Sequence, residues 1–232
     1  MKFITANWPA PANIKACTTL RTGWGEGKYD PADLHKRAAL KDLLSLPNDP
    51  IWINQTHSNI ALEAVPANKD SIADASYTTE PNTVCVVLTA DCLPVFICNK
   101  QGTQIAVIHA GWRGLANNII ESTINAMRLS AEDALVWLGP AIGPDRFEVG
   151  RDVYDAFVSR HAESANAFVS KPAEKWLANL YALAKIRLKQ RGITQVYGGD
   201  YCTYSQDELF FSYRRDKNTA GRMANVIWIE KD

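Results

Sequence analysis

Three short runs of apolar residues place the strongest constraint on the fold of this chain. They are VCVVLT at 84–89, IAVIHA at 105–110 and ALVWLG at 134–139. None of them alternates between apolar and polar positions, as a strand with one solvated face does. Strands that are apolar on both sides lie in the centre of a sheet whose two faces are covered by other layers. The runs therefore predict a layered protein with a well-buried sheet.

The other elements follow from similar patterns. Apolar stripes of helical spacing predict helices at residues 115–127, 150–160 and 174–191. Runs rich in β-branched and aromatic residues predict further strands at 14–19, 51–54, 60–65, 94–98, 193–197 and 225–230. Strands and helices mix without strict alternation, which favours the α+β class. No repeat or flexible linker divides the sequence, so we expect one domain over residues 1–232.

Charge and composition disfavour several classes of function. The 25 basic and 25 acidic residues cancel, so the chain has no excess positive charge for binding nucleic acid. No apolar run approaches the length of a membrane span, and the first residues, MKFITANWPAP, do not resemble a signal peptide. Five scattered cysteines do not form a disulfide framework. We therefore expect a cytoplasmic protein that binds small molecules, with no nucleic acid or membrane partner.

Three side chains stand at or beside the ends of predicted strands, and their chemistry points to a metal. His57 follows the strand at 51–54, Cys92 lies in a turn before Pro94, and His109 closes the strand IAVIHA. Two imidazoles and one thiolate are a ligand set of catalytic zinc, which keeps a fourth position for water or substrate.

Two other interpretations fit the same side chains. Cys92 is a nucleophile in one of them, with His57 or His109 as its base. In the other the zinc is structural, and Cys85 or Cys98 closes its coordination as a fourth ligand.

Arginines supply candidate anion sites. Arg113 lies in the turn GWRG, between a predicted strand and a predicted helix, where backbone N–H groups and a guanidinium can face a phosphate. Arg214 and Arg215 follow the sequence FFSY and form a second candidate site. We expect an anionic substrate group to bind at one or both places.

Five motifs in order resemble the YfiH family, also called laccase-domain or polyphenol-oxidase-like proteins. They are TADCLPV (89–95), HAGWRGL (109–115), LGPAIGP (138–144), FEVG (147–150) and FFSYRRD (210–216). The resemblance implies a layered α/β/β/α fold with mixed sheets, similar to the deamidase domain of cytotoxic necrotising factor. It also implies that His57, Cys92 and His109 are the metal ligands.

The resemblance further implies a zinc-dependent purine nucleoside phosphorylase with adenosine deaminase activity. Its substrates would be phosphate and adenosine, inosine, guanosine or methylthioadenosine, with Arg21, Arg113 and Arg214 as candidates for anion binding. Relatives are also associated with copper-dependent polyphenol oxidation and with an amidase that edits serine-containing UDP-muramoyl peptidoglycan precursors. Four histidines in the whole chain are few for a multicopper cluster, so zinc is the leading metal and copper the alternative.

Overall fold

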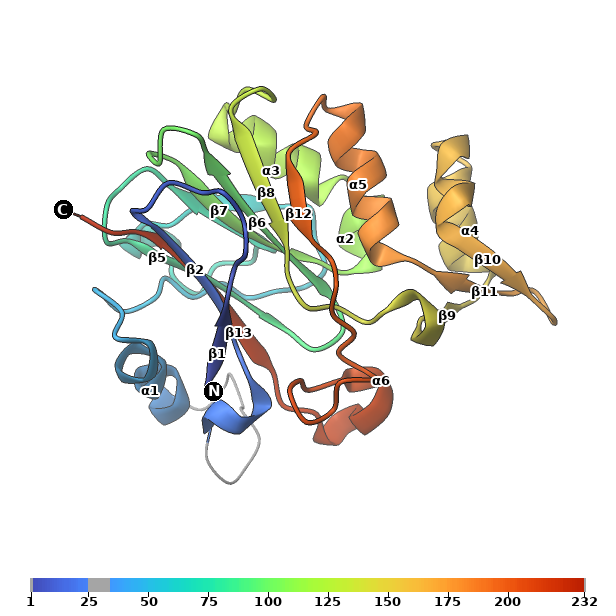
Figure 1. Cartoon of the computed structure of the whole chain (residues 1–232), viewed down its shortest axis with the longest axis horizontal. Helices are drawn as coiled ribbons and strands as arrows, with labels where there is room; N and C mark the ends of the chain where they lie inside the picture. The colour runs from blue at the N-terminus through green and yellow to red at the C-terminus, as the bar shows by residue number, and fades with distance from the viewer. Residues whose placement is uncertain (1, 25–33, 232) are drawn as a thin grey trace.

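A computed structural model describes residues 2–24 and 34–231 of the chain (Figure 1). The largest sheet has six strands, in the spatial order β12 (Val196–Gly198), β8 (Ala134–Leu138), β6 (Leu93–Asn99), β7 (Ile105–Ala110), β4 (Ala75–Thr78) and β3 (Ala61–Glu63). The outer pairs β12–β8 and β3–β4 are parallel, and the pairs between them are antiparallel. Every residue of β6, β7 and β8 is buried, which explains their continuous apolar sequences.

A second sheet packs face to face against the first. It is antiparallel, in the order β1 (Phe3–Thr5), β2 (Ile14–Thr19), β13 (Met223–Ile229) and β5 (Val84–Thr89). Its Val87 and Ile227 share one buried cluster with Phe96 and Trp137 of the six-stranded sheet. The rings of Phe96 and Trp137 have centroids 5.2 Å apart. This cluster is the core between the two sheets.

Helices cover the two outer faces (Figure 1). The helices α2 (Trp112–Ala116), α3 (Ile119–Met127) and α5 (Leu180–Gln190) share a buried cluster with the six-stranded sheet. The helix α1 (Leu34–Leu44) packs Leu40 and Leu44 on the four-stranded sheet. The layers therefore run α/β/β/α with a mixed sheet, and the predicted fold class is confirmed.

Smaller elements lie beside these layers. A three-stranded antiparallel sheet of β9 (Glu148–Val149), β11 (Lys175–Ala178) and β10 (Phe168–Lys171) packs against α4 (Arg151–Val158). A short helix α6 (Tyr213–Asp216) precedes β13. Short 3-10 helices occupy Arg21–Trp24, Pro66–Asn68, Pro144–Arg146, Ala162–Ala167 and Lys217–Thr219. None of the helices in the described ranges has the length and apolar character that crossing a bilayer requires.

Two predicted helices differ from those in the structure. The helix predicted at 174–191 begins at Leu180, because Asn179 caps it by accepting a hydrogen bond from the Ala182 amide (3.0 Å). Residues before the cap form β11, since pairing with two neighbouring strands outweighs their helical spacing. The helix predicted at 115–127 is broken between α2 and α3, where Asn118 has a φ of 69°. Its apolar stripe is nevertheless buried against the sheet, as expected.

Several strand predictions were also wrong. Residues 51–54 form two isolated bridges, Ile51 with Cys85 and Asn54 with Ile72, in place of a strand. The strand predicted at 193–197 is shifted to β12, and the strand at 60–65 shortens to β3. The strands β1, β4, β9 and β10 were not predicted, and each is only two to four residues long. Such short elements depend on their partners more than on their own sequence.

Candidate metal centre

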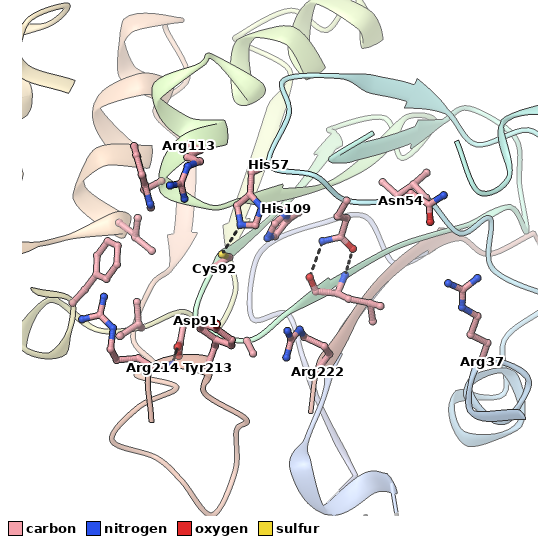
Figure 2. A pocket seen from close by; sticks show the side chains of 18 residues that line it. Arg37, Asn54, His57, Asp91, Cys92, His109, Arg113, Tyr213, Arg214 and Arg222 are labelled. Atoms are coloured by element: carbon pink, nitrogen blue, oxygen red, sulfur yellow. Dashed lines mark hydrogen bonds between the residues drawn. The ribbon is translucent and has the colours of Figure 1, made fainter. Parts of the chain in front are cut away.

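The three predicted ligands meet at one end of the six-stranded sheet (Figure 2). His57 lies in the loop before β3, Cys92 in the turn between β5 and β6, and His109 in β7. The antiparallel register pairs Leu93 with Ala110, which brings Cys92 beside the end of β7. We call His57, Cys92 and His109 the His–Cys–His group. It unites residues from three separate segments of the chain.

The dimensions of the His–Cys–His group fit a zinc ion. Its ligand atoms lie within 4.8 Å of one another, and Cys92 Sγ is 3.8 Å from His57 Nε2. Zinc bonds of ~2.3 Å to sulfur and ~2.0 Å to nitrogen place tetrahedral ligands about 3.5 Å apart, close to this distance. The two imidazole rings meet edge to face, with centroids 4.7 Å apart. Small movements of the side chains would complete three-ligand coordination.

Gly111 keeps the space beside the ligands free. A Cβ atom at this position would lie 2.7 Å from His57 Cδ2 and 3.0 Å from Cys92 Sγ. Any side chain would therefore collide with two of the three ligands. Strand and helix patterns do not explain why the motif HAGWRG has a glycine at this position. The space taken by His57 and Cys92 explains it.

The charges within the His–Cys–His group stabilise one another. Burial opposes ionisation of the Cys92 thiol, but the charge of His109 and hydrogen bonds from both histidines lower its pKa to about 6. Burial also opposes protonation of His109, but Cys92 and Asp74 raise the pKa of His109 to about 9. Each of the two groups thus favours the charged form of the other, a thiolate beside an imidazolium. A thiolate is the form of cysteine that both binds metal and acts as a nucleophile.

Asp74 is a residue of the site that sequence reasoning missed. It lies directly before β4, is fully buried, and accepts a hydrogen bond of 2.7 Å from His109 Nδ1. Burial would raise the pKa of this carboxyl, but His109 and Ser58 lower it to about 2. A charged residue inside the apolar segment SIADASY was the available signal, because an aspartate is almost never fully buried without a partner.

The His–Cys–His group opens into a cavity of about 720 Å³ (Figure 2). Its wall includes the predicted Arg113 and Arg214, and also Arg222 and Arg37, which were not predicted as site residues. We call Arg113, Arg214 and Arg222 the arginine wall. Among the described residues, none of these three guanidinium groups forms an ion pair with a carboxylate. The cavity therefore carries positive charge available to an anion.

Two predicted arginines lie elsewhere. The guanidinium of Arg21 stacks on the ring of Phe211 at 5.6 Å, donates to the Asp207 carbonyl (3.2 Å), and does not line the cavity. Arg215 is paired with Asp216 and donates to three backbone carbonyls, so it stabilises its loop. The second candidate anion site therefore consists of Arg214 without Arg215.

Asp91 ties the arginine wall to the loop of Cys92. Its carboxylate accepts hydrogen bonds from the Arg214 backbone amide (2.6 Å) and from the Thr203 hydroxyl (2.7 Å). Asp91 has a φ of 84°, a conformation that L-residues rarely adopt. On the opposite wall, Gln55 anchors the His57 loop to β5 through two hydrogen bonds with the Leu88 backbone (Figure 2).

No fourth protein ligand joins the His–Cys–His group within the described residues. Cys85 and Cys98, the candidates for closing a structural site, are buried in β5 and β6, and burial raises the pKa of each thiol to about 12. Neutral buried thiols of this kind act as small apolar side chains. A site of three ligands with an open side is the arrangement of catalytic zinc.

The fold and the site together define a class: layered α/β/β/α proteins with an open group of two histidines and one cysteine that could hold a metal ion. Residues 18–230 match the family described as "Multi-copper polyphenol oxidoreductase laccase". The chain belongs to this family of laccase-domain proteins, which includes YfiH. Purine nucleoside phosphorylase YfiH of Escherichia coli K12 is 44% identical over 98% of this chain and 99% of that protein.

Other relatives extend this similarity over the whole chain. A purine nucleoside phosphorylase of Haemophilus influenzae is 44% identical over 99% of this chain and all of its own length. The crystal structure of a Neisseria meningitidis protein superposes with a TM-score of 0.93 at 42% identity, covering both chains completely. YlmD of Geobacillus stearothermophilus has the same fold, with a TM-score of 0.90 at 23% identity, over 100% of this chain and 97% of that one.

Proposed function

We propose that this chain is a zinc-dependent purine nucleoside phosphorylase that also deaminates adenosine. Adenosine, inosine, guanosine and methylthioadenosine are its proposed nucleosides, and phosphate is the second substrate. The observation that carries the proposal is the His–Cys–His group opening into a cavity with the arginine wall. Full-length relatives named as purine nucleoside phosphorylases support it. Action in the cytoplasm, by one catalytic domain over residues 1–232, is part of the same proposal.

The cavity has the groups that phosphorolysis requires. A phosphate oxygen forms a bond to C1′ of the ribose while the C1′–N9 bond breaks, and the purine leaves with the bonding electron pair. Guanidinium groups bind phosphate through paired N–H donors, so Arg113 and Arg214 would hold it and offset its charge. Binding both substrates in one cavity removes much of the entropic cost of bringing them together.

The other walls would hold the nucleoside and the metal. Ile53, Leu88, Ile142 and Leu180 provide apolar surface for a purine ring. His57, Cys92 and His109 would bind the zinc. When bound, zinc supplies Lewis-acid polarisation of a substrate oxygen and lowers the pKa of a coordinated water, which is the chemistry that deamination needs.

The test is an assay of purified, zinc-loaded protein with adenosine, in the presence and absence of phosphate. Chromatography is expected to detect adenine and ribose 1-phosphate only with phosphate, and inosine in both conditions. His109→Ala removes one ligand and is expected to abolish all three products. If the wild-type protein forms none of them, the proposal is wrong.

Copper-dependent polyphenol oxidation is the second candidate, and the description of the matching family favours it. The His–Cys–His group could hold one copper ion, since imidazole and thiolate also bind copper. Metal analysis of protein prepared without added copper separates the two candidates. Oxidation of a catechol by copper-loaded protein, with no nucleoside activity in zinc-loaded protein, would favour the oxidase.

A Cys92-dependent amidase acting on serine-containing UDP-muramoyl peptidoglycan precursors is the third candidate. The pairing of Cys92 with His109 favours it, because a thiolate beside an imidazolium is a competent nucleophile. Mass spectrometry of protein incubated with the precursor would detect an acyl group on Cys92. Release of serine by Cys92→Ser at the wild-type rate would exclude this mechanism.

A further inference from the structure

The Asp74 carboxylate forms hydrogen bonds with both histidines of the site, His57 and His109. Its Oδ1 accepts hydrogen bonds from His109 Nδ1 (2.7 Å) and from the His57 backbone amide (3.0 Å). Its Oδ2 accepts from the Thr56 amide (3.1 Å) and from the amide and hydroxyl of Ser58 (both 2.6 Å). One buried side chain therefore receives five hydrogen bonds, all from His109 or from residues 56–58.

These bonds fix the ring of His109. Because Asp74 accepts the proton of Nδ1, the ring is held with Nε2 facing the rest of the His–Cys–His group and free of hydrogen when a metal binds. The backbone reinforces this, since the His109 amide donates to the Asp74 carbonyl (2.7 Å). Both the orientation and the tautomer of this ligand thus depend on Asp74.

The same carboxylate fixes the backbone of His57. Three consecutive amides, of residues 56, 57 and 58, converge on it and form an anion-binding nest. His57 itself has a φ of 62°, in the left-handed region that residues with a side chain rarely adopt. Such a conformation persists only where the surrounding structure stabilises it, and here the hydrogen bonds to the Asp74 carboxylate do so.

We propose that Asp74 is the positioning residue of the metal site, fixing the ring of His109 through Oδ1 and the loop of His57 through both oxygens. The inference rests on the proposed zinc site. Asp74 is fully buried and does not line the cavity, so it acts on the metal only through the two histidines. Carboxylates that orient histidine ligands in this way typically contribute ~10- to 100-fold to metal affinity.

Asp74→Asn is a sharp test because the amide fails in either orientation. With its NH₂ toward His109, Nδ1 must accept a hydrogen bond, so the proton moves to Nε2 and blocks the metal. With its NH₂ toward residues 56 and 58, donor faces donor and the His57 loop is released. Each orientation displaces one ligand, so we expect zinc affinity to fall about 10- to 100-fold.

Asp91→Asn is the matched control. Asp91 is also a buried carboxylate that accepts a backbone amide and a hydroxyl, and it is adjacent to Cys92, but it bonds to neither histidine. Asparagine tolerates its positive φ well, so the turn is kept. We expect the zinc affinity of Asp91→Asn to stay within about threefold of wild type. The larger loss expected for Asp74→Asn comes from misoriented histidine ligands, and Asp91 orients neither histidine.

The experiment measures zinc dissociation constants by competition with a chromogenic chelator, on protein shown to be folded by circular dichroism. Equal zinc affinity in wild type and Asp74→Asn, or an equal loss in both variants, overturns the positioning role alone. Absence of zinc binding by the wild type overturns the proposed function as well. If Asp74→Asn does not fold, nitrogen NMR of zinc-loaded wild type decides: a proton on His109 Nδ1 supports the inference, and a proton on Nε2 overturns it.

Discussion

The His–Cys–His group and the arginine wall border the same cavity but are held in different ways. His109 is buried in a central strand, and a buried carboxylate bonds to it directly. Arg113 is exposed and rests on the ring of Trp112 at 4.3 Å, while Arg214 and Arg222 donate to backbone carbonyls. The metal side is therefore prearranged by the core through His109, whereas the anion side consists of partly or fully exposed side chains on two short helices, α2 and α6, and on the segment before β13.

The largest expected effect tests the prearranged side. Gly111→Ala places a Cβ atom 2.7 Å from His57 Cδ2 and 3.0 Å from Cys92 Sγ, so both side chains must move from the positions in which they face each other. Zinc affinity is expected to fall by about 100-fold or more. This loss is larger than the one usually caused by substituting a residue that only hydrogen-bonds to a metal ligand. Chelator competition measures it.

Gly150→Ala is the control for that substitution. Gly150 lies at the start of the helix α4, outside the cavity, and its Cβ would lie 2.8 Å from Asp152 Oδ1, the end of an exposed side chain that can turn away. Zinc affinity close to wild type is expected. If Gly111→Ala also binds zinc normally, the metal is held elsewhere or differently.

The His–Cys–His group could be predicted from the sequence more completely than the arginine wall. Cys92 and His109, two of the candidate metal ligands, lie beside strand ends, which residue patterns locate, and the structure brings both together with His57 from a loop. Asp74 was not predicted as a site residue, because its role depends on the pairing of β4 with β7, which joins residues 75 and 108. The local sequence shows only a charged residue within a largely apolar segment, and it does not show which distant residue that charge contacts.

The arginine wall was less predictable. Arg113 and Arg214 line the cavity, but Arg21 lies against Phe211, and Arg222 was not among the predicted site residues. Where a loop arginine points depends on packing between distant segments. The same limit explains β11, whose helical spacing gives way to pairing with two strands.

The second prediction compares Arg214 with Arg21. Arg214→Ala removes a guanidinium that faces the cavity without a carboxylate partner among the described residues. The KM for phosphate is expected to rise about 10- to 100-fold, because one or two charge-assisted hydrogen bonds are lost. Arg21→Ala removes an arginine outside the cavity and should change this KM less than about threefold. Steady-state phosphorolysis measures both values. Equal effects of the two substitutions would mean that Arg214 does not bind the phosphate.

The next prediction tests the link between the two regions. Thr203→Val removes the hydroxyl that donates to Asp91, leaving a buried carboxylate with one bond fewer. We expect the free energy of unfolding to fall by about 1–3 kcal/mol, while Asp91 still accepts the Arg214 amide. Urea unfolding measures this change.

Thr219→Val is its control, because that hydroxyl donates to the Asp216 carbonyl at an exposed position, and its loss should cost less than about 0.5 kcal/mol. The zinc affinity of both variants is expected to match wild type. A loss of zinc affinity in Thr203→Val alone would show that the arginine side also positions Cys92.

The smallest expected effect is a difference in salt dependence between the two regions. The arginine wall attracts phosphate through charges that border solvent, so the KM for phosphate should rise about two- to threefold between 0.05 and 0.3 M salt as screening shortens their range. Zinc affinity should change less, because its ligands are bonded directly and His109 is buried. Arg214→Ala should flatten the salt dependence of KM, since it removes one of the charges that salt screens. A salt dependence of KM that is unchanged in Arg214→Ala would place the attraction for phosphate on cations other than Arg214.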